Sequence, residues 1–124
     1  MPETTPCPFC EIAAGRAPAE VAESWPDTIA IRPLNPVADG HLLVIPRGHV
    51  EDALHDPAVT GLVMQRAVQV GRLYRCDLNI ITSVGPAATQ SVKHLHVHLV
   101  PRFAGDGLLL PWTLQQAEAV SVDG

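Results

Sequence analysis

The sequence predicts an α+β domain: a five-stranded antiparallel sheet with one long helix packed on one face. Two observations support this prediction. First, 12 prolines and 9 glycines divide the 124 residues into short segments, and most apolar segments between them have the length of strands. Second, one longer segment between the third and fourth strands repeats its apolar residues at helical spacing.

The expected strands cover residues 19–24, 28–32, 41–45, 78–84 and 93–100. β-branched residues are common in the second strand, and Pro46 and Pro101 are expected to end the third and fifth strands. Side chains alternate between the two faces of a strand, so His41, Leu43 and Ile45 share one face. Such a sheet covers one face with the helix and can leave the other open to solvent or to a ligand.

The helix is expected to begin after Asp56 and to run to about Cys76. Asp56 has the side chain of an N-cap, and Pro57 suits the first helical position because its N–H would need no partner there. The apolar residues that recur at helical spacing are Val59, Leu62, Val63, Ala67, Val70, Leu73 and Tyr74. They predict the face of the helix that packs on the sheet.

Length and charge limit the possible classes of protein. We expect one domain over residues 1–112 and a C-terminal tail over 113–124. The net charge of −5 argues against a nucleic-acid or anionic-membrane partner. No apolar run could span a bilayer and the N-terminus does not resemble a signal peptide, so a cytoplasmic protein is expected. Three cysteines do not suit a disulfide framework, and Cys76 is expected in the core.

The segment HLHVHLV, residues 94–100, alternates histidine with apolar residues. On a strand, His94, His96 and His98 would project from one face about 7 Å apart, and the apolar residues between them would face the helix. Imidazole, with an unperturbed pKa of about 6.5, suits both a nucleophile and a proton donor near neutral pH. Two histidines at i and i+2 can also ligate zinc, so a metal-binding strand is the alternative interpretation.

The segment CPFC, residues 7–10, places two thiols two residues apart. Such a pair is either a redox couple or half of a metal site. A dithiol oxidoreductase needs a strand before the motif, and the six residues before Cys7, two of them prolines, do not predict one. A metal site needs two further ligands, which histidines of this chain can supply.

Three further segments accompany the histidine row: NPVADGHLLVIPRGHV at residues 35–50, TQSV at 89–92 and RFAGDG at 102–107. Together with the alternating histidines they resemble the histidine triad family of nucleotide hydrolases and transferases. The resemblance extends over roughly residues 7–112. The combination of segments is far more specific than any one of them.

The resemblance implies that the middle histidine, His96, attacks the α-phosphorus of a nucleotide conjugate and forms a nucleotidyl-histidine intermediate. The conjugate would be a phosphoramidate or a dinucleoside polyphosphate. His98 is implied to assist at the leaving group, and His41 to complete the cluster. Gln90 and Ser91 match positions that touch phosphate or bridging oxygens, with ordinary loop polarity as their alternative interpretation. No cofactor is required for this catalysis.

The resemblance also implies a structural zinc ion held by Cys7, Cys10, His49 and His94. Two sulfurs and two nitrogens suit a closed tetrahedral site, which would leave His96 for catalysis. The alternative is that both thiols are unligated and that the histidine at position 49 is a surface residue.

The sequence departs from the family at two positions that concern the substrate. Pro33 stands where many members carry an aspartate that holds the ribose hydroxyls, with Asn35 as a nearby substitute. Ser83 stands where an asparagine is often found. Members of this size usually pair as homodimers, so the resemblance implies a homodimer here, and Trp112 is a candidate contributor to a partner's site. A second function stays open: a non-catalytic, zinc-stabilised nucleotide-binding module that retains the histidines.

Overall fold

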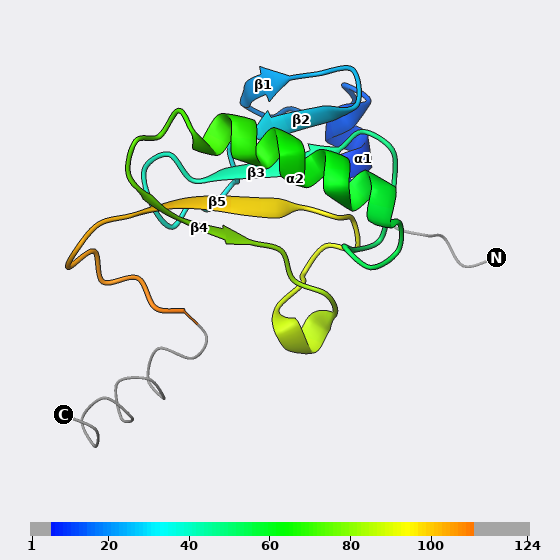
Figure 1. The fold of residues 1–124 in the computed structure, drawn as a ribbon. Coiled ribbons are helices and arrows are strands. Elements are labelled where there is room, and N and C mark those ends of the chain that lie inside the picture. The colour runs from blue at the N-terminus through cyan, green and yellow to red at the C-terminus, as the bar shows by residue number, and fades with distance from the viewer. Residues whose placement is uncertain (1–5, 111–124) are drawn as a thin grey trace.

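The computed structural model of this protein describes residues 6–110, which form a five-stranded antiparallel sheet with a helix on each face (Figure 1). The order across the sheet is β1-β2-β3-β5-β4. The strands are β1 (Val21–Ser24), β2 (Thr28–Ile31), β3 (Leu42–Pro46), β4 (Asp77–Ile81) and β5 (Val97–Arg102). The helices are α1 (Pro8–Ala13) and α2 (Pro57–Gly71), and Pro86–Ala88 forms the 3₁₀ turn η1.

The predicted fold class is confirmed. No helix within residues 6–110 is long and apolar enough to cross a membrane. Trp112 and the expected tail at 113–124 lie outside the described residues.

Helix α2 begins where the sequence predicts and ends earlier than predicted. The Asp56 carboxylate accepts hydrogen bonds from the N–H groups of Ala58 and Val59, as an N-cap does. The helix ends at Gly71 rather than near Cys76. Beyond it the backbone tightens into a turn, and Arg75, with φ of +56°, reverses the chain toward β4.

The alternating faces of the strands pack into two separate apolar layers. Figure 1 shows α2 lying across one face of the sheet. The buried residues of that layer are Ala30, Leu42, Val44, Val63, Ala67, Val70, Leu95, Val97 and Leu99. The apolar residues of the HLHVHLV segment therefore face α2, as predicted.

The second face of the sheet is partly covered by a short helix that the sequence analysis did not predict. Helix α1 covers part of it, and Phe9 packs against a layer made of Ile29, Ile31, Leu43 and Ile45. The Cys7 sulfur accepts from the Cys10 N–H at the start of α1, and Pro8 occupies the first turn. Both faces of β2 and β3 are thus covered, which explains why every residue of these two strands is buried.

Strand β5 begins at Val97, four residues later than predicted, because its pairing with β3 stops there although β3 itself continues to Pro46. The last pair between these strands is Val44↔Val97, and Pro46 has no N–H to continue the ladder. The Leu95 N–H donates to the Val50 carbonyl at 2.6 Å instead. At its other end β5 continues through Pro101 to Arg102, where β4 is the one strand among the described residues that pairs with it.

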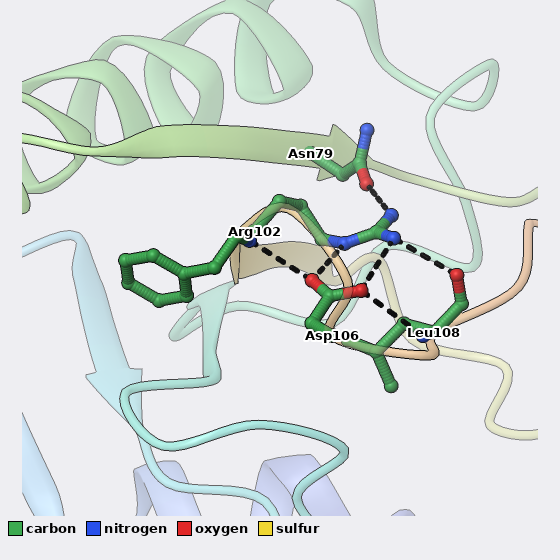
Figure 2. A network of polar contacts seen from close by, with 5 residues as sticks. Asn79, Arg102, Asp106 and Leu108 are labelled. Carbon is green, nitrogen blue, oxygen red and sulfur yellow. Dashed lines mark hydrogen bonds and ion pairs between the residues drawn. The ribbon is translucent and has the colours of Figure 1, made fainter.

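The chain leaves β5 through a turn organised by Asp106 (Figure 2). The Asp106 carboxylate accepts two hydrogen bonds from Arg102, at 2.9 and 3.0 Å, and two from the N–H groups of Phe103 and Leu108. These bonds, with that of Arg102 as the largest cause, hold the pKa of Asp106 far below its usual value. Arg102 also donates to Asn79 on β4 at 2.6 Å, so the turn is tied to the edge of the sheet.

The approach to β3 is fixed by a close contact at Gly40. Gly40 has φ of +86°, and a Cβ atom there would lie 3.2 Å from Cγ of Pro101 and 3.4 Å from Cε2 of Tyr74. The Tyr74 hydroxyl donates to the Gly40 carbonyl at 2.5 Å. This contact sets the position of His41, the next residue.

Replacing Gly40 should therefore destabilise the protein more than replacing a glycine of similar φ in open space. Gly15, with φ of +78° and nothing within 4 Å of its hypothetical Cβ, is the matched control. We expect Gly15→Ala to lower the free energy of unfolding by about 1 kcal/mol from backbone strain alone. Gly40→Ala should lower it by about 1 kcal/mol more because of the added contacts. Urea unfolding measures both, and equal losses would contradict the role of the contact.

Candidate functional site

His41, His96 and His98 gather on the face of the sheet that α1 partly covers. The pair Leu43↔His98 places His98 beside a residue of the α1 layer, and His41 immediately precedes β3. The ring centroid of His98 lies 5.1 Å from that of His96 and 5.2 Å from that of His41. His41 and His96 are only 6% and 8% exposed. The structure thus brings together all three residues that the sequence predicts for catalysis.

A hydrogen bond to the backbone fixes the tautomer of His96. Its Nδ1 lies 2.7 Å from the His94 carbonyl oxygen. A carbonyl can only accept, so Nδ1 carries the proton, and Nε2 of a neutral ring keeps its lone pair. His96 therefore has the arrangement that a nitrogen nucleophile requires.

A second chain of hydrogen bonds fixes the tautomers of His41 and His98. The Val37 N–H donates to His41 Nδ1 at 3.1 Å, so that nitrogen is unprotonated. His41 Nε2 must then carry a proton, and it lies 3.0 Å from His98 Nδ1, which accepts it. In the neutral form of His98, the remaining proton sits on Nε2. The loop before β3 thus determines which nitrogen of His98 can donate.

Burial favours the uncharged forms of the His41 and His98 rings. It lowers the pKa of His41, and it lowers the pKa of His98 to about 4, with smaller contributions from the neighbouring His96 and His41. No carboxylate within residues 6–110 forms a hydrogen bond with His41, His96 or His98. The neighbouring imidazoles of His41 and His98 can therefore lie together near neutral pH without charge repulsion.

Sequence analysis missed two residues that support the cluster. Phe9 of α1 meets the rings of His94 and His96 edge-on, at centroid distances of 5.7 and 5.1 Å. The Thr82 hydroxyl, just after β4, donates to the His96 carbonyl at 2.9 Å. No local pattern marks either residue, because each acts on histidines far away in the sequence.

Gln90 and Ser91, the two polar residues predicted to contact phosphate, have different surroundings in the loop at residues 83–91. The Gln90 amide oxygen accepts from the Gly85 N–H at 2.8 Å, and its nitrogen donates to the carbonyls of Glu51 and Val92. These bonds hold the loop in shape. Ser91 is exposed, and its hydroxyl has no hydrogen-bond partner within residues 6–110, so it is available to a ligand.

The other two predicted substrate contacts lie on different loops. Asn35 is exposed in the loop between β2 and β3, two residues after Pro33. Ser83 is half-buried and directly follows Thr82. Neither side chain forms a hydrogen bond with another described residue, and their contact with a substrate stays a prediction.

Cys7, Cys10, His49 and His94 form a cluster that could hold a metal ion, and their ligand atoms all lie within 4.8 Å of one another. The Sγ atoms of Cys7 and Cys10 lie 3.3 and 3.5 Å from His94 Nδ1, and Cys10 Sγ lies 3.3 Å from His49 Nδ1. A tetrahedral zinc ion with ordinary bond lengths would separate sulfur and nitrogen ligands by about 3.5 Å. The donor set and the spacing both fit.

The surroundings of the cluster also suit a metal site. His94 Nε2 donates to the Pro46 carbonyl at 2.9 Å, which leaves Nδ1 unprotonated and aimed at the sulfurs. Burial, followed by the hydrogen bond and charge of Cys7, raises the pKa of the Cys10 thiol to about 11. A bound cation would displace that proton.

Comparison with known proteins agrees with this geometry. The HIT domain family model matches residues 14–105. An uncharacterized HIT-like protein of Methanocaldococcus jannaschii is 35% identical over 106 residues, which cover 82% of this chain and 82% of the relative. An adenosine 5'-monophosphoramidase of Saccharomyces cerevisiae is 31% identical over 116 residues, covering 90% of this chain and 73% of the relative.

A solved structure of a histidine triad protein is also similar to this chain. The crystal structure of a hypothetical histidine triad nucleotide-binding protein from Sulfolobus tokodaii superposes with a TM-score of 0.74 at 30% identity. The match covers 80% of this chain and 70% of that one. With the three clustered histidines and the family match over most of its length, this chain belongs to the histidine triad (HIT) family.

Proposed function

We propose that this protein is a nucleotide-binding hydrolase or nucleotidyl transferase that cleaves at the α-phosphorus of a nucleotide conjugate. The observation that carries the proposal is the bond from His96 Nδ1 to the His94 carbonyl, because it leaves Nε2 as a free nucleophile. A phosphoramidate or dinucleoside polyphosphate is the proposed substrate class. The similarity to a yeast adenosine 5'-monophosphoramidase supports the first of these.

The proposed reaction has two steps. His96 Nε2 attacks the α-phosphorus, a P–N bond to the histidine forms, and the leaving group departs with the electron pair of its former bond to phosphorus; an amine leaving group takes up a proton from solvent as it departs. The positive charge that develops on the ring is stabilised by the Nδ1–H bond to the His94 carbonyl. Water then attacks the phosphorus, the electron pair of the broken P–N bond returns to Nε2, and a proton goes to solvent.

His98 and His41 have supporting roles in this proposal. The Nε2–H of neutral His98 donates a hydrogen bond to the leaving group as negative charge develops there. His41 holds His98 in the donating tautomer through the 3.0 Å contact of their rings. Among the loop residues, the exposed Ser91 hydroxyl is proposed to contact phosphate directly, whereas Gln90 holds the loop in shape.

We propose zinc as the metal of the Cys7, Cys10, His49 and His94 cluster. Four protein ligands would close the coordination shell, so the ion would supply structural stability. His94 also contributes the carbonyl that orients His96, so holding His94 in the cluster also holds the nucleophile in its orientation.

We further propose a homodimer formed along β4. Within residues 6–110 this strand pairs only with β5, and its other edge carries no strand there. Ile80 on β4 is 43% exposed and Val84 just beyond it is 37% exposed, which gives this edge apolar surface that a second copy could cover.

Replacing His96 with alanine should abolish turnover while nucleotide binding persists. We would follow monophosphate release from a panel of nucleoside phosphoramidates and dinucleoside polyphosphates, each in ribo and deoxy form. Acid quenching of the wild type should trap a covalent nucleotide adduct that mass spectrometry assigns to His96. His55→Ala, which changes an exposed histidine outside the cluster, is the control. Binding without turnover in the wild type would support the non-catalytic module instead.

Stability should fall as the pH is lowered, partly because of His98. In the unfolded chain His98 takes up a proton near its ordinary pKa of about 6.5, whereas in the folded protein it does so only at about 4. Between these two pKa values the unfolded state binds more protons than the folded state. The corresponding stabilisation is therefore fully present above about pH 6.5 and is lost as the pH falls toward 4. Thermal unfolding measured from about pH 7 to 4 should therefore show a weaker pH dependence for His98→Gln than for the wild type. The exposed-site control His55→Gln should keep the wild-type dependence, and an unchanged dependence in His98→Gln would refute this assignment.

Cys10→Ser should remove the metal and lower the melting temperature. Elemental analysis of protein purified without chelator should find about one zinc ion per wild-type chain. Cys76→Ser offers a matched control, because Cys76 is half-buried and lies outside the cluster. A wild type free of zinc, with Cys7 and Cys10 reacting at once with a thiol reagent, would refute the zinc proposal.

A further inference from the structure

The backbone of His96 lies beyond the end of the sheet ladder on both sides. The last pair between β4 and β5 is Ile81↔His98, and the last pair between β3 and β5 is Val44↔Val97. Neither neighbouring strand pairs with His96. Its carbonyl accepts a hydrogen bond from the Thr82 hydroxyl at 2.9 Å instead. A side chain therefore supplies the bond that the ladder does not.

We propose that Thr82 is a positioning residue for His96, an inference that rests on the proposed function. The His96 ring bonds back to the His94 carbonyl at 2.7 Å, and the His96 carbonyl is held by Thr82. The first bond holds the side chain of His96, and the second holds its backbone carbonyl. Loss of the Thr82 bond would let the backbone at His96 shift, and the Nε2 lone pair would lose its alignment with the phosphorus.

Thr82 also connects His96 to the loop that carries Ser91. The loop begins directly after Thr82 and is closed by Gln90, whose amide bonds to the Gly85 N–H and the Glu51 carbonyl. The Thr82 hydroxyl thus fixes the start of this loop relative to the nucleophile. Because threonine is branched at Cβ, few side-chain rotamers are open to it and the hydroxyl is held in place.

Thr82→Val tests the hydroxyl with little change in shape. We expect kcat to fall about tenfold while KM changes less than about twofold, since misalignment of the nucleophile affects the transition state more than ground-state binding. Thr82→Ser keeps a hydroxyl and should restore most of kcat. The rate of nucleotidyl-histidine formation in a single turnover should fall with kcat.

Thr60→Val is the matched control. The Thr60 hydroxyl donates to the Ala53 carbonyl at 2.7 Å in the first turn of α2, the same kind of bond but with no partner among His41, His96 and His98. It should lower the melting temperature without lowering kcat. Equal kcat values for Thr82→Val and Thr60→Val would overturn the proposal, because Thr82 would then be only structural. If Thr82→Val does not fold, Thr82→Ala takes its place with the same expectations.

A spectroscopic measurement tests the inference without turnover. In the wild type the ¹⁵N signals of the His96 ring should show a protonated Nδ1 and an unprotonated Nε2. In Thr82→Val the two signals should move toward each other as the tautomers mix. Unchanged signals would overturn the inference about Thr82. Retained turnover in His96→Ala, by contrast, would overturn the proposed function itself, so the two failures can be told apart.

Discussion

The hydrogen bond from His96 to the His94 carbonyl is the contact on which the arrangement of the site depends. It selects the tautomer of His96, and it does so through a residue whose own ring belongs to the cysteine and histidine cluster. The His94 ring is completely buried, and its two nitrogens face the Pro46 carbonyl and the sulfurs. The carbonyl that orients His96 is therefore part of one of the most restrained residues of the protein.

The end of the sheet ladder explains why this restraint is needed. Pro46 cannot donate to β5, and residues 94–96 are not paired as part of a strand. The Leu95 N–H bonds to Val50, and the remaining bonds of the segment come from side chains and neighbouring turns. In irregular backbone of this kind, local hydrogen bonds replace the rigidity that a ladder would give.

Burial explains how several histidines can share one face of the sheet. The sequence alone suggests a crowded row of cations, which would be unfavourable. The structure resolves this conflict because the buried rings of His41 and His98 lose their protons more readily than exposed imidazoles. Each neutral ring then has one donor and one acceptor. The Val37 N–H sets the direction of the hydrogen bonds that run through His41 to His98.

The sequence by itself determined the features that depend on local pattern. The α+β class, the N-cap at Asp56 and the apolar face toward α2 follow from periodicity and capping chemistry, which act over a few residues. The candidate site residues came from motif resemblance, and the structure brings His41, His96 and His98 together, and likewise the four members of the metal-binding cluster.

Only the tertiary structure decided how those residues are oriented. The α1 helix is six residues long and has too little periodicity to be recognised, yet its Phe9 covers the histidines. The tautomers, the engaged amide of Gln90 and the hydroxyl of Thr82 all depend on hydrogen bonds to backbone groups that no local motif specifies. Cys7 and His94 are 87 positions apart and meet at 3.3 Å because α1 packs on the sheet, with its Phe9 against the His94 ring. Local sequence encodes which elements form, whereas the packing of distant elements sets the geometry on which the chemistry depends.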